Sequence, residues 1–284
     1  NAEPGSFEVC VAHHLEPAIY SLEHLDAFIR TLIAQQIQAY PIHLKIDTGM
    51  HRLGFLPEQI ERLLQTINAQ PEVLIKSVYS HMACADTPQH PMNLQQIELF
   101  KEICAQIQHS LPYTFIRHLL NSEGSAHFPN AQFDMVRLGI GLYGIESNQL
   151  ERAHLQHVAT LKTSISQIKE LKKGDTVGYG RSGVMPKDGK IATVKIGYAD
   201  GYPRALGNGN GMMLINNQLV PTIGNICMDM TMLDITDTHV NIGDDVIVFG
   251  EGLDVYTLAN QLKTIPYEVI TNISQRVKRV YYYE

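Results

Sequence analysis

The feature that most constrains the fold is an alternation of helix-like and strand-like segments over the first 148 residues. Apolar residues recur at helical spacing over 22–38, 57–67 and 92–109. Runs of β-forming residues occupy 42–47, 73–82 and 114–120, and one more short strand with a glycine-rich turn is expected over 134–144. Apolar residues three or four positions apart mark one face of a helix, whereas short apolar runs between turns mark strands. This alternation predicts a parallel α/β fold, either an open doubly wound sheet or a β/α barrel.

The length of this first part bears on the choice between the two. A closed eight-stranded barrel usually takes about 250 residues, and some 148 residues of that length accommodate about four or five strand–helix units. No GxGxxG motif follows a strand, so a dinucleotide-binding sheet has no support. We therefore expect either an open sheet or a barrel whose opening units lie outside this sequence.

The pattern changes after residue 155. Segments 160–171, 190–199, 211–236 and 244–250 are rich in β-forming residues, and turn signals occur at 207–211, at Asn216-Asn217 and at 250–252. One helix is expected at about 255–263. The sequence thus predicts two domains, an α/β domain over 1–150 that is either an open sheet or a partial β/α barrel, and a mostly β domain over 151–284.

Composition and charge exclude several classes of protein. The net charge is −7 and no basic run occurs, which argues against nucleic acid or an anionic membrane as a partner. No apolar stretch approaches the ~18 residues of a membrane span. The four cysteines form no CxxC pair, which indicates free thiols in a reducing, cytoplasmic compartment, and neither they nor the 13 histidines show a metal-ligand pattern.

Several strand ends carry residues suited to a cofactor site. Lys45 and Arg52 flank a turn at 47–49, and the carboxyl ends of parallel strands are where active sites form. Taken singly, these are ordinary surface cations, and His81, Arg137 and Tyr179 likewise have purely structural interpretations. Together with glycines that let the backbone approach a phosphate, they suggest a site for an anionic, planar cofactor. A tyrosine serving as acid or base there would need nearby cations, because the pKa of a phenol is ordinarily about 10.

Seven motifs, in this order along the chain, carry a resemblance to a known family: HLKIDTGMHRLGF, NSEGS, VRLGIGLYG, VGYGRS, IGYADGYPR, GNICMDM and TIPYEV. The chain resembles the alanine racemases, which join a β/α barrel to a C-terminal β domain and use pyridoxal 5′-phosphate. The resemblance implies interconversion of L- and D-alanine by two-base transfer of the α-proton, supplying D-alanine for peptidoglycan. It also implies a cytoplasmic homodimer in which the β domain of one subunit reaches the barrel site of the other.

The resemblance implies a role for each matching residue. Tyr179 matches the catalytic tyrosine, which moves the α-proton on one face of the substrate. Arg137 matches the arginine that bonds the pyridine nitrogen, and His81 the histidine that bonds this arginine. Arg52 matches the arginine beside the cofactor's phenolic oxygen and the substrate carboxylate, and Lys45 a lysine that is often carbamylated and positions Arg52.

The remaining correspondences concern the phosphate and the substrate. The phosphate-binding set is Asn121, Ser122, Gly139, Ile140 and Tyr267. The substrate-side residues are Met228, Asp229 and Tyr198, and Tyr198 also lines the entry corridor with Asp86 and Ile265. Asn225 stands where many relatives carry arginine, a departure that changes the charge of the corridor.

The larger departure concerns the second base. In the family this is the lysine that binds the cofactor covalently, in a motif like K-A-x-A-Y-G-H-G. No such motif occurs, and Lys45, Lys76 and Lys101 do not stand in that context. We expect this lysine and the first barrel units to precede Asn1. The alternatives are a catalytically incomplete, racemase-like dimerisation or regulatory module, and a serine or broad-specificity racemase of the same fold. A related decarboxylase is disfavoured because no run of three glycines occurs.

Overall fold

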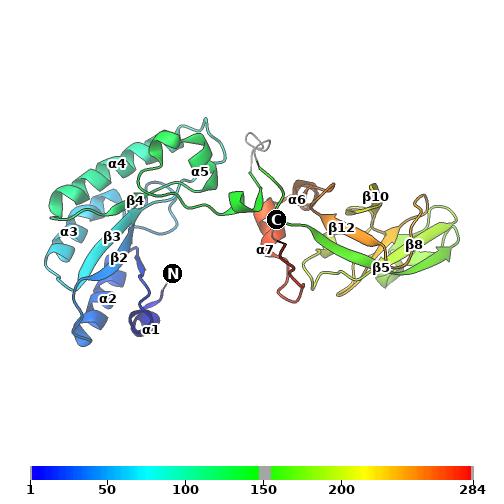
Figure 1. Cartoon of the computed structure of the whole chain (residues 1–284), viewed down its shortest axis with the longest axis horizontal. Coiled ribbons are helices and arrows are strands. Elements are labelled where there is room, and N and C mark those ends of the chain that lie inside the picture. Colours follow the sequence, from blue (N-terminus) through cyan, green and yellow to red (C-terminus); the bar gives the residue numbers. More distant parts are fainter. Residues whose placement is uncertain (1, 147–154, 283–284) are drawn as a thin grey trace. The chain divides into compact units, whose positions relative to one another are not determined.

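A computed structural model describes residues 2–146 and 155–282. The chain divides into an α/β unit that extends from the N-terminus to Gly141 and a β-rich unit that begins at Leu142 (Figure 1). The predicted domain boundary at 150/151 falls within 147–154, outside the described residues. None of the described helices combines the length and apolar character that a membrane crossing requires.

The α/β unit is built on a parallel sheet, which confirms the predicted fold class. Its four strands, in the spatial order β1-β2-β3-β4 within residues 2–146, are β1 Ala18–Ile19, β2 Tyr40–Lys45, β3 Val73–Tyr79 and β4 Ile116–His118. The register places His43 beside Ser77, and Tyr79 beside both Lys45 and His118. Polar side chains of β2, β3 and β4 therefore meet near the carboxyl edge of the sheet.

Helices alternate with these strands. They are α1 Phe7–Ala12, α2 Leu22–Ala34, α3 Ile60–Asn68, α4 Met92–Ser110 and α5 Ser122–His127, with the 3₁₀ turns η1 Pro4–Ser6, η2 Pro57–Gln59, η3 Pro129–Ala131 and η4 Ile140–Tyr143. Ser21 caps α2 as predicted, because its side chain accepts a hydrogen bond from the His24 N–H at 3.2 Å. The helix ends at Ala34 rather than at residue 38, since Gln36 has a positive φ of 56°.

The strand predicted within 134–144 is wrong. Asp134 and Arg137 donate backbone hydrogen bonds to Arg117 and Leu120, three residues apart on each side, which is not the alternation of a ladder. The N–H groups of Gly139 and Gly141 turn instead to the Ser122 side chain. The segment is therefore an extended strap that ends in the 3₁₀ turn η4.

The core of the α/β unit lies between the helices and the sheet. Phe28 of α2, Leu63 of α3 and Phe100 of α4 are fully buried, as are Ile42 and Leu44 of β2. Burying side chains of this size stabilises the fold by roughly 1.5–3 kcal/mol each. The apolar faces of these helices and strands therefore pack in the core, and the polar groups lie at the strand ends.

The β-rich unit contains an antiparallel sheet, as predicted. Within 155–282 the spatial order of its strands is β10-β9-β12-β5-β8-β11. These strands are β5 Leu161–Leu171, β8 Gly189–Val194, β9 Met212–Ile215, β10 Gln218–Pro221, β11 Thr231–Asp234 and β12 Asp245–Phe249. The unit also contains the two-stranded ribbon of β6 Thr176–Val177 and β7 Gly183–Val184, the 3₁₀ turns η6 Tyr179–Arg181 and η7 Arg204–Leu206, and the helices α6 Val255–Leu262 and α7 Pro266–Thr271. Asn216 and Asn217 close the β9–β10 hairpin with φ of 48° and 62°. Two positive φ angles are typical of the hairpin turn predicted there.

Candidate functional site

Arg137 is the hub of the polar cluster in the α/β unit. Its Nη1 donates to His118 Nδ1 at 2.6 Å and to the His118 carbonyl at 3.1 Å. Its Nη2 donates to the carbonyls of Ser80 at 2.6 Å and Leu119 at 3.0 Å, and lies 3.4 Å from His81 Nδ1. Acceptors at the ends of β3 and β4 therefore fix the guanidinium plane, and none of these bonds uses Nε–H. Burial lowers the pKa of Arg137, but a guanidinium stays protonated in proteins.

Lys45 and Tyr79 lie beside this guanidinium. The Lys45 Nζ is 4.9 Å from the centre of the Tyr79 ring, and Arg137 Cζ is 5.4 Å from it. The Tyr79 ring also stacks on His118, with ring centres 5.0 Å apart. Burial, followed by the charges of Arg52 and Arg137, lowers the pKa of Lys45. A lysine among cations is thus biased toward its neutral, reactive amine.

Both histidines of this cluster are neutral at physiological pH. Burial, and then the charge of Arg137, lowers the pKa of His81 and of His118 to about 4. Arg52 and Lys45 contribute further to the lowering of the pKa of His81. Because an arginine only donates hydrogen bonds, Nδ1 of His118 is an acceptor. Positive charge in the site is therefore carried by the arginines rather than by imidazolium.

A second group of donors suits a phosphate. Asn121 caps α5, accepting from the Gly124 N–H at 2.9 Å, and Ser122 is the first residue of that helix. The Ser122 Oγ receives the N–H groups of Gly139 at 2.8 Å and Gly141 at 3.3 Å. A hydroxyl and two backbone N–H groups therefore converge on one point, and a phosphoryl oxygen is a suitable acceptor for all three. The residues present fit the phosphate of pyridoxal 5′-phosphate.

The close approach of backbone and Ser122 depends on Gly141. A Cβ at this position would lie 3.3 Å from both Cβ and Oγ of Ser122, tighter than ordinary contact. Sequence reasoning selected Gly139 and Ile140 and missed Gly141. The signal was present in the sequence as the second glycine of LGIG.

Tyr179 lies on the β-rich unit, at the start of η6. Its neighbours Gly178 and Gly180 have φ of 76° and 67°, so the chain turns sharply on both sides of it. The side chain is 72% exposed. The Asn225 Nδ2 donates to the Tyr179 carbonyl at 2.9 Å, which ties the turn to the loop before Met228. The phenol is thus held on a defined backbone and presented outward.

A groove of about 660 Å³ lies beside this tyrosine. It is lined by Tyr179, Met228 and Asp229, together with apolar residues such as Val177 and Met230. Tyr179 and two of the three predicted substrate-side residues, Met228 and Asp229, therefore share one surface. Positions 198, 265 and 267 do not line it, and the roles given to them stay predictions, as does that of Asp86 in the α/β unit.

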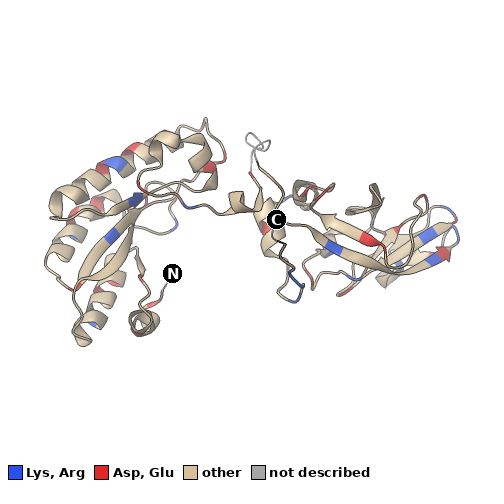
Figure 2. Cartoon of the chain, in the orientation of Figure 1, with Lys and Arg blue, Asp and Glu red and all other residues tan. Residues whose placement is uncertain are grey.

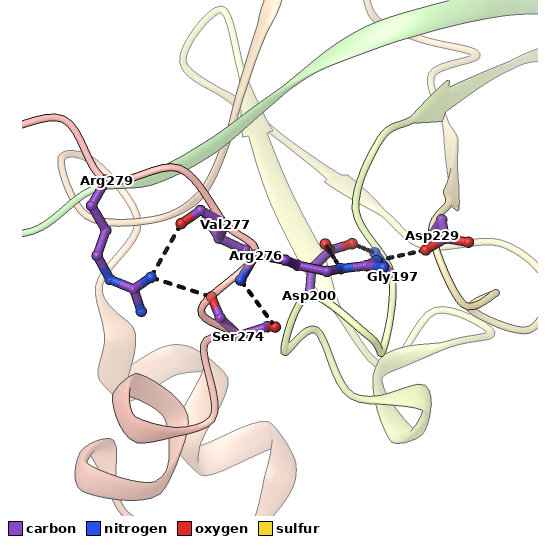
Figure 3. Close-up of polar contacts among 7 residues, drawn as sticks. All are labelled: Gly197, Asp200, Asp229, Ser274, Arg276, Val277 and Arg279. Atoms are coloured by element: carbon purple, nitrogen blue, oxygen red, sulfur yellow. Dashed lines mark hydrogen bonds and ion pairs between the residues drawn. The ribbon is translucent and has the colours of Figure 1, made fainter.

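Arg276 connects two loops of the β-rich unit, one of which carries the groove residue Asp229 (Figure 3). Its Nε donates to Asp200 Oδ1 at 2.7 Å and its Nη2 donates to Asp229 Oδ1 at 2.6 Å. The other Asp200 oxygen accepts the Gly197 N–H at 2.9 Å. One guanidinium thus joins the loop of Asp200 to that of Asp229. Sequence reasoning missed it because the three residues belong to segments far apart in the chain.

Comparison with known proteins identifies this arrangement. The family model for the alanine racemase N-terminal domain matches residues 1–147, and the model for the C-terminal domain matches residues 158–281. The chain belongs to the alanine racemase family. Together the two models span nearly all of it, so the fold is that of the racemases, an α/β barrel domain followed by a β-rich domain.

Individual racemases agree with this assignment. The alanine racemase of Clostridium novyi is 35% identical, over 98% of this chain and 74% of that protein. That of Vesicomyosocius okutanii is 40% identical, over 87% of this chain and 68% of that protein. The crystal structure of the enzyme from Streptomyces lavendulae superimposes with a TM-score of 0.92 at 29% identity, covering 100% of this chain and 77% of that one. The structure from Bartonella henselae, which has covalently bound pyridoxal phosphate, gives 0.87 at 28% identity over 98% and 76%.

The racemase assignment accounts for both clusters of polar residues. In the α/β unit the structure brings together Lys45, His81 and Arg137, and the charge of Arg52 lowers the pKa of Lys45 and of His81. Acidic and basic residues are interspersed along the ribbon of each unit rather than segregated (Figure 2). A small racemase substrate is recognised by a few fixed cations of this kind, without a charged surface.

Proposed function

We propose that the chain acts in a pyridoxal 5′-phosphate-dependent alanine racemase that interconverts L- and D-alanine. The observation that carries the proposal is the fixed guanidinium of Arg137, followed in the sequence by the Gly139 and Gly141 donors that converge on Ser122. A planar, anionic cofactor with a ring nitrogen and a phosphate matches these two features. A cytoplasmic enzyme, supplying D-alanine for peptidoglycan, agrees with four free cysteines, all of them in the described part of the chain.

The chain's own residues position the cofactor and the substrate. When bound, the cofactor withdraws electrons from the substrate Cα and so acidifies its α-proton. Arg137, always protonated, would hold the ring nitrogen by donating a hydrogen bond, so that this nitrogen would need no proton of its own. The resulting weaker electron sink favours racemisation over transamination. Ser122, Gly139 and Tyr267 would hold the phosphate, and Asn121 and Ile140 would shape the backbone around it.

Substrate residues complete the site. Arg52 binds the carboxylate of alanine, because guanidinium and carboxylate form charge-assisted pairs. Met228 and Asp229 lie on the substrate side, and Tyr198 lines the approach. Tyr179 takes or returns the α-proton on one face of Cα. The test is an assay of D-alanine formation from L-alanine by the holoenzyme, with and without added cofactor, and with L-serine as the competing substrate. Faster turnover of serine than of alanine would contradict the assignment.

We propose that Lys45 is carbamylated. Its lowered pKa favours the free amine, whose nitrogen attacks carbon dioxide and releases a proton. The carbamate is negative and would stabilise Arg52 and Arg137, which the lysine cation opposes. Labelling with ¹³C-bicarbonate is expected to give one carbamate carbon signal that Lys45→Gln abolishes and that Lys76→Gln retains. A protein without any such signal would show Lys45 to be an ordinary amine.

The lysine that binds the cofactor is proposed to be none of the three in the α/β unit. Lys76 pairs with Glu16 at 2.6 Å and Lys101 with Glu98 at 2.8 Å, both on the surface. Lys45 lies among cations and is assigned to carbamylation. We propose that a segment outside these 284 residues supplies this lysine. Reduction of the holoenzyme with borohydride and peptide mapping is expected to find pyridoxyl on a peptide outside the present sequence, and a label on Lys45 would contradict this.

We propose a homodimer in which the β-rich unit of one subunit completes the α/β site of the other. Tyr179 and Met228 are 72% and 53% exposed in the single chain, although both are assigned to chemistry that requires exclusion of water. A partner subunit that covers the groove would provide this exclusion. Light scattering of the holoenzyme is expected to give twice the mass of one subunit.

A further inference from the structure

We propose that Glu16, His43, Ser77 and His118 form a one-way hydrogen-bond chain that positions Arg137, and that Ser77 is its essential link. The inference rests on the proposed function only for the role of Arg137 at the cofactor ring. The four residues are named the Glu16–His118 chain below. None of them belongs to the seven motifs by which the family was recognised except His43, whose part there was unassigned.

The chain crosses three neighbouring strands without a gap. His118 of β4 accepts from Arg137 through Nδ1 at 2.6 Å, and its Nε2 lies 3.0 Å from Ser77 Oγ of β3. The same Oγ lies 2.6 Å from His43 Nδ1 of β2. The His43 Nε2 is 2.9 Å from Glu16 Oε2. The strand register explains this continuity, since His43 and Ser77 are paired neighbours and β3 pairs with β4.

The direction of every bond follows from the two ends. Arg137 only donates, so His118 Nδ1 accepts and its proton is on Nε2, which donates to Ser77. Ser77 has one hydroxyl proton, and that proton goes to His43 Nδ1. His43 then holds its own proton on Nε2 and donates it to the Glu16 carboxylate, which only accepts. Both imidazoles are therefore fixed as the Nε2–H tautomer by an arginine at one end and a carboxylate at the other.

Burial makes this arrangement hard to replace. Ser77 is 1% exposed and His118 is 6% exposed, so water cannot substitute for either partner. A second proton on His43, at Nδ1, would make both His43 Nδ1 and His118 Nε2 donors to the Ser77 Oγ. The Ser77 hydroxyl proton would then have no acceptor in a buried site. At the outer end, Lys76 holds Glu16 through its other oxygen at 2.6 Å. The hydrogen bond and charge of Lys76, with His43, lower the pKa of Glu16, so the acceptor stays ionised.

The consequence concerns the orientation of Arg137. In the other tautomer, His118 would point an N–H at the guanidinium, and two donors would face each other. The Tyr79 ring stacked on His118 restricts the imidazole from leaving its plane. The Glu16–His118 chain thus keeps a lone pair aimed at Arg137. It acts through Arg137 and touches neither the cofactor nor the substrate, so its members are positioning residues.

The first test uses the protein without cofactor and is independent of activity. Nitrogen-15 NMR of the histidine rings, assigned by loss of signal in His118→Gln, is expected to show His118 as the pure Nε2–H tautomer. Ser77→Ala is expected to yield a mixture of the two tautomers, whereas Ser77→Thr, which keeps the hydroxyl, retains one. Ser110→Ala is the matched control, because Ser110 Oγ bonds only a carbonyl of its own helix. A single Nε2–H tautomer in Ser77→Ala would overturn the proposal.

The second test uses the holoenzyme. Ser77→Ala is expected to lower kcat for alanine by about 10-fold with KM changed less than twofold, since a misplaced Arg137 affects the reacting ring more than substrate binding. The cofactor absorption band is expected to shift in the same variant, and Ser77→Thr to restore both. Glu16→Ala, at the outer, half-buried end of the chain, is expected to lower kcat about threefold without loss of folding. Unchanged kcat and absorption in both variants would overturn the positioning role. An inactive wild type with the expected tautomers would instead overturn the proposed function alone.

Discussion

Exchange of Tyr179 for phenylalanine is expected to slow alanine racemisation by about 10²–10⁴-fold, the range that a positioned acid or base contributes. The phenol oxygen is the only atom removed, and the side chain is 72% exposed, so little packing is lost. The backbone turn is held by Asn225 through the Tyr179 carbonyl, which the substitution leaves in place. Cofactor affinity is therefore expected to change less than threefold.

The measurement is kcat in each direction, L to D and D to L, together with the dissociation constant of the cofactor. Tyr281→Phe provides a matched control, because Tyr281 is 74% exposed and does not line the groove beside Tyr179. It is expected to behave as the wild type. Equal losses of cofactor affinity and of rate in Tyr179→Phe would mean that the tyrosine supports the fold of the site and does not transfer the proton.

The second large effect is expected from Arg137→Lys, which is not a conservative change at this position. The guanidinium serves acceptors on Ser80, His118 and Leu119 at once, and an ammonium group on a shorter stem cannot reach all of them. The remaining carbonyls would be left without donors, and the contact to the ring nitrogen would be misplaced. A misplacement of about 1 Å lowers rates by roughly 10²-fold.

The change should also alter which reaction occurs. A lysine ammonium gives up its proton more readily than a guanidinium, so the ring nitrogen becomes protonated more often and the electron sink strengthens. Pyruvate formation relative to racemisation is therefore expected to rise in Arg137→Lys. Arg117→Lys is the control, since Arg117 forms an exposed ion pair with Asp134. A variant that keeps both the wild-type rate and its ratio of products would remove Arg137 from the cofactor site.

Local patterns predicted the elements that depend on them. The helix cap at Ser21, the Asn216-Asn217 hairpin and the parallel sheet all follow from short-range spacing and turn chemistry. The strap at 134–144 was mistaken for a strand because its apolar residues resemble one. Its backbone bonds go to positions 117 and 120 and to a serine side chain, partners that no local pattern shows.

The residues of the candidate site likewise fall into those that local motifs predicted and those that they did not. Lys45, Arg137 and Ser122 were predicted because each stands in a recognisable motif. Tyr79, whose ring lies near Lys45 and Arg137, was missed because an aromatic residue within a run of β-forming residues carries no functional signal in the sequence. His118 and Ser77 were missed because their function arises from pairing across β3 and β4, and Arg276 because it joins loops distant in sequence. Contacts of this kind exist only once the chain is folded.

Subunit mixing tests the central claim most directly, namely that Arg137 and Tyr179 serve one racemisation reaction from the two units of a shared site. The homodimers of Arg137→Lys and of Tyr179→Phe are each expected to be nearly inactive. After dissociation and reassociation in equal amounts, about half of the dimers are mixed, and each has one site with both wild-type residues. The account predicts recovery of roughly a quarter of the wild-type alanine racemase activity. Mixed dimers no more active than their parents would contradict it.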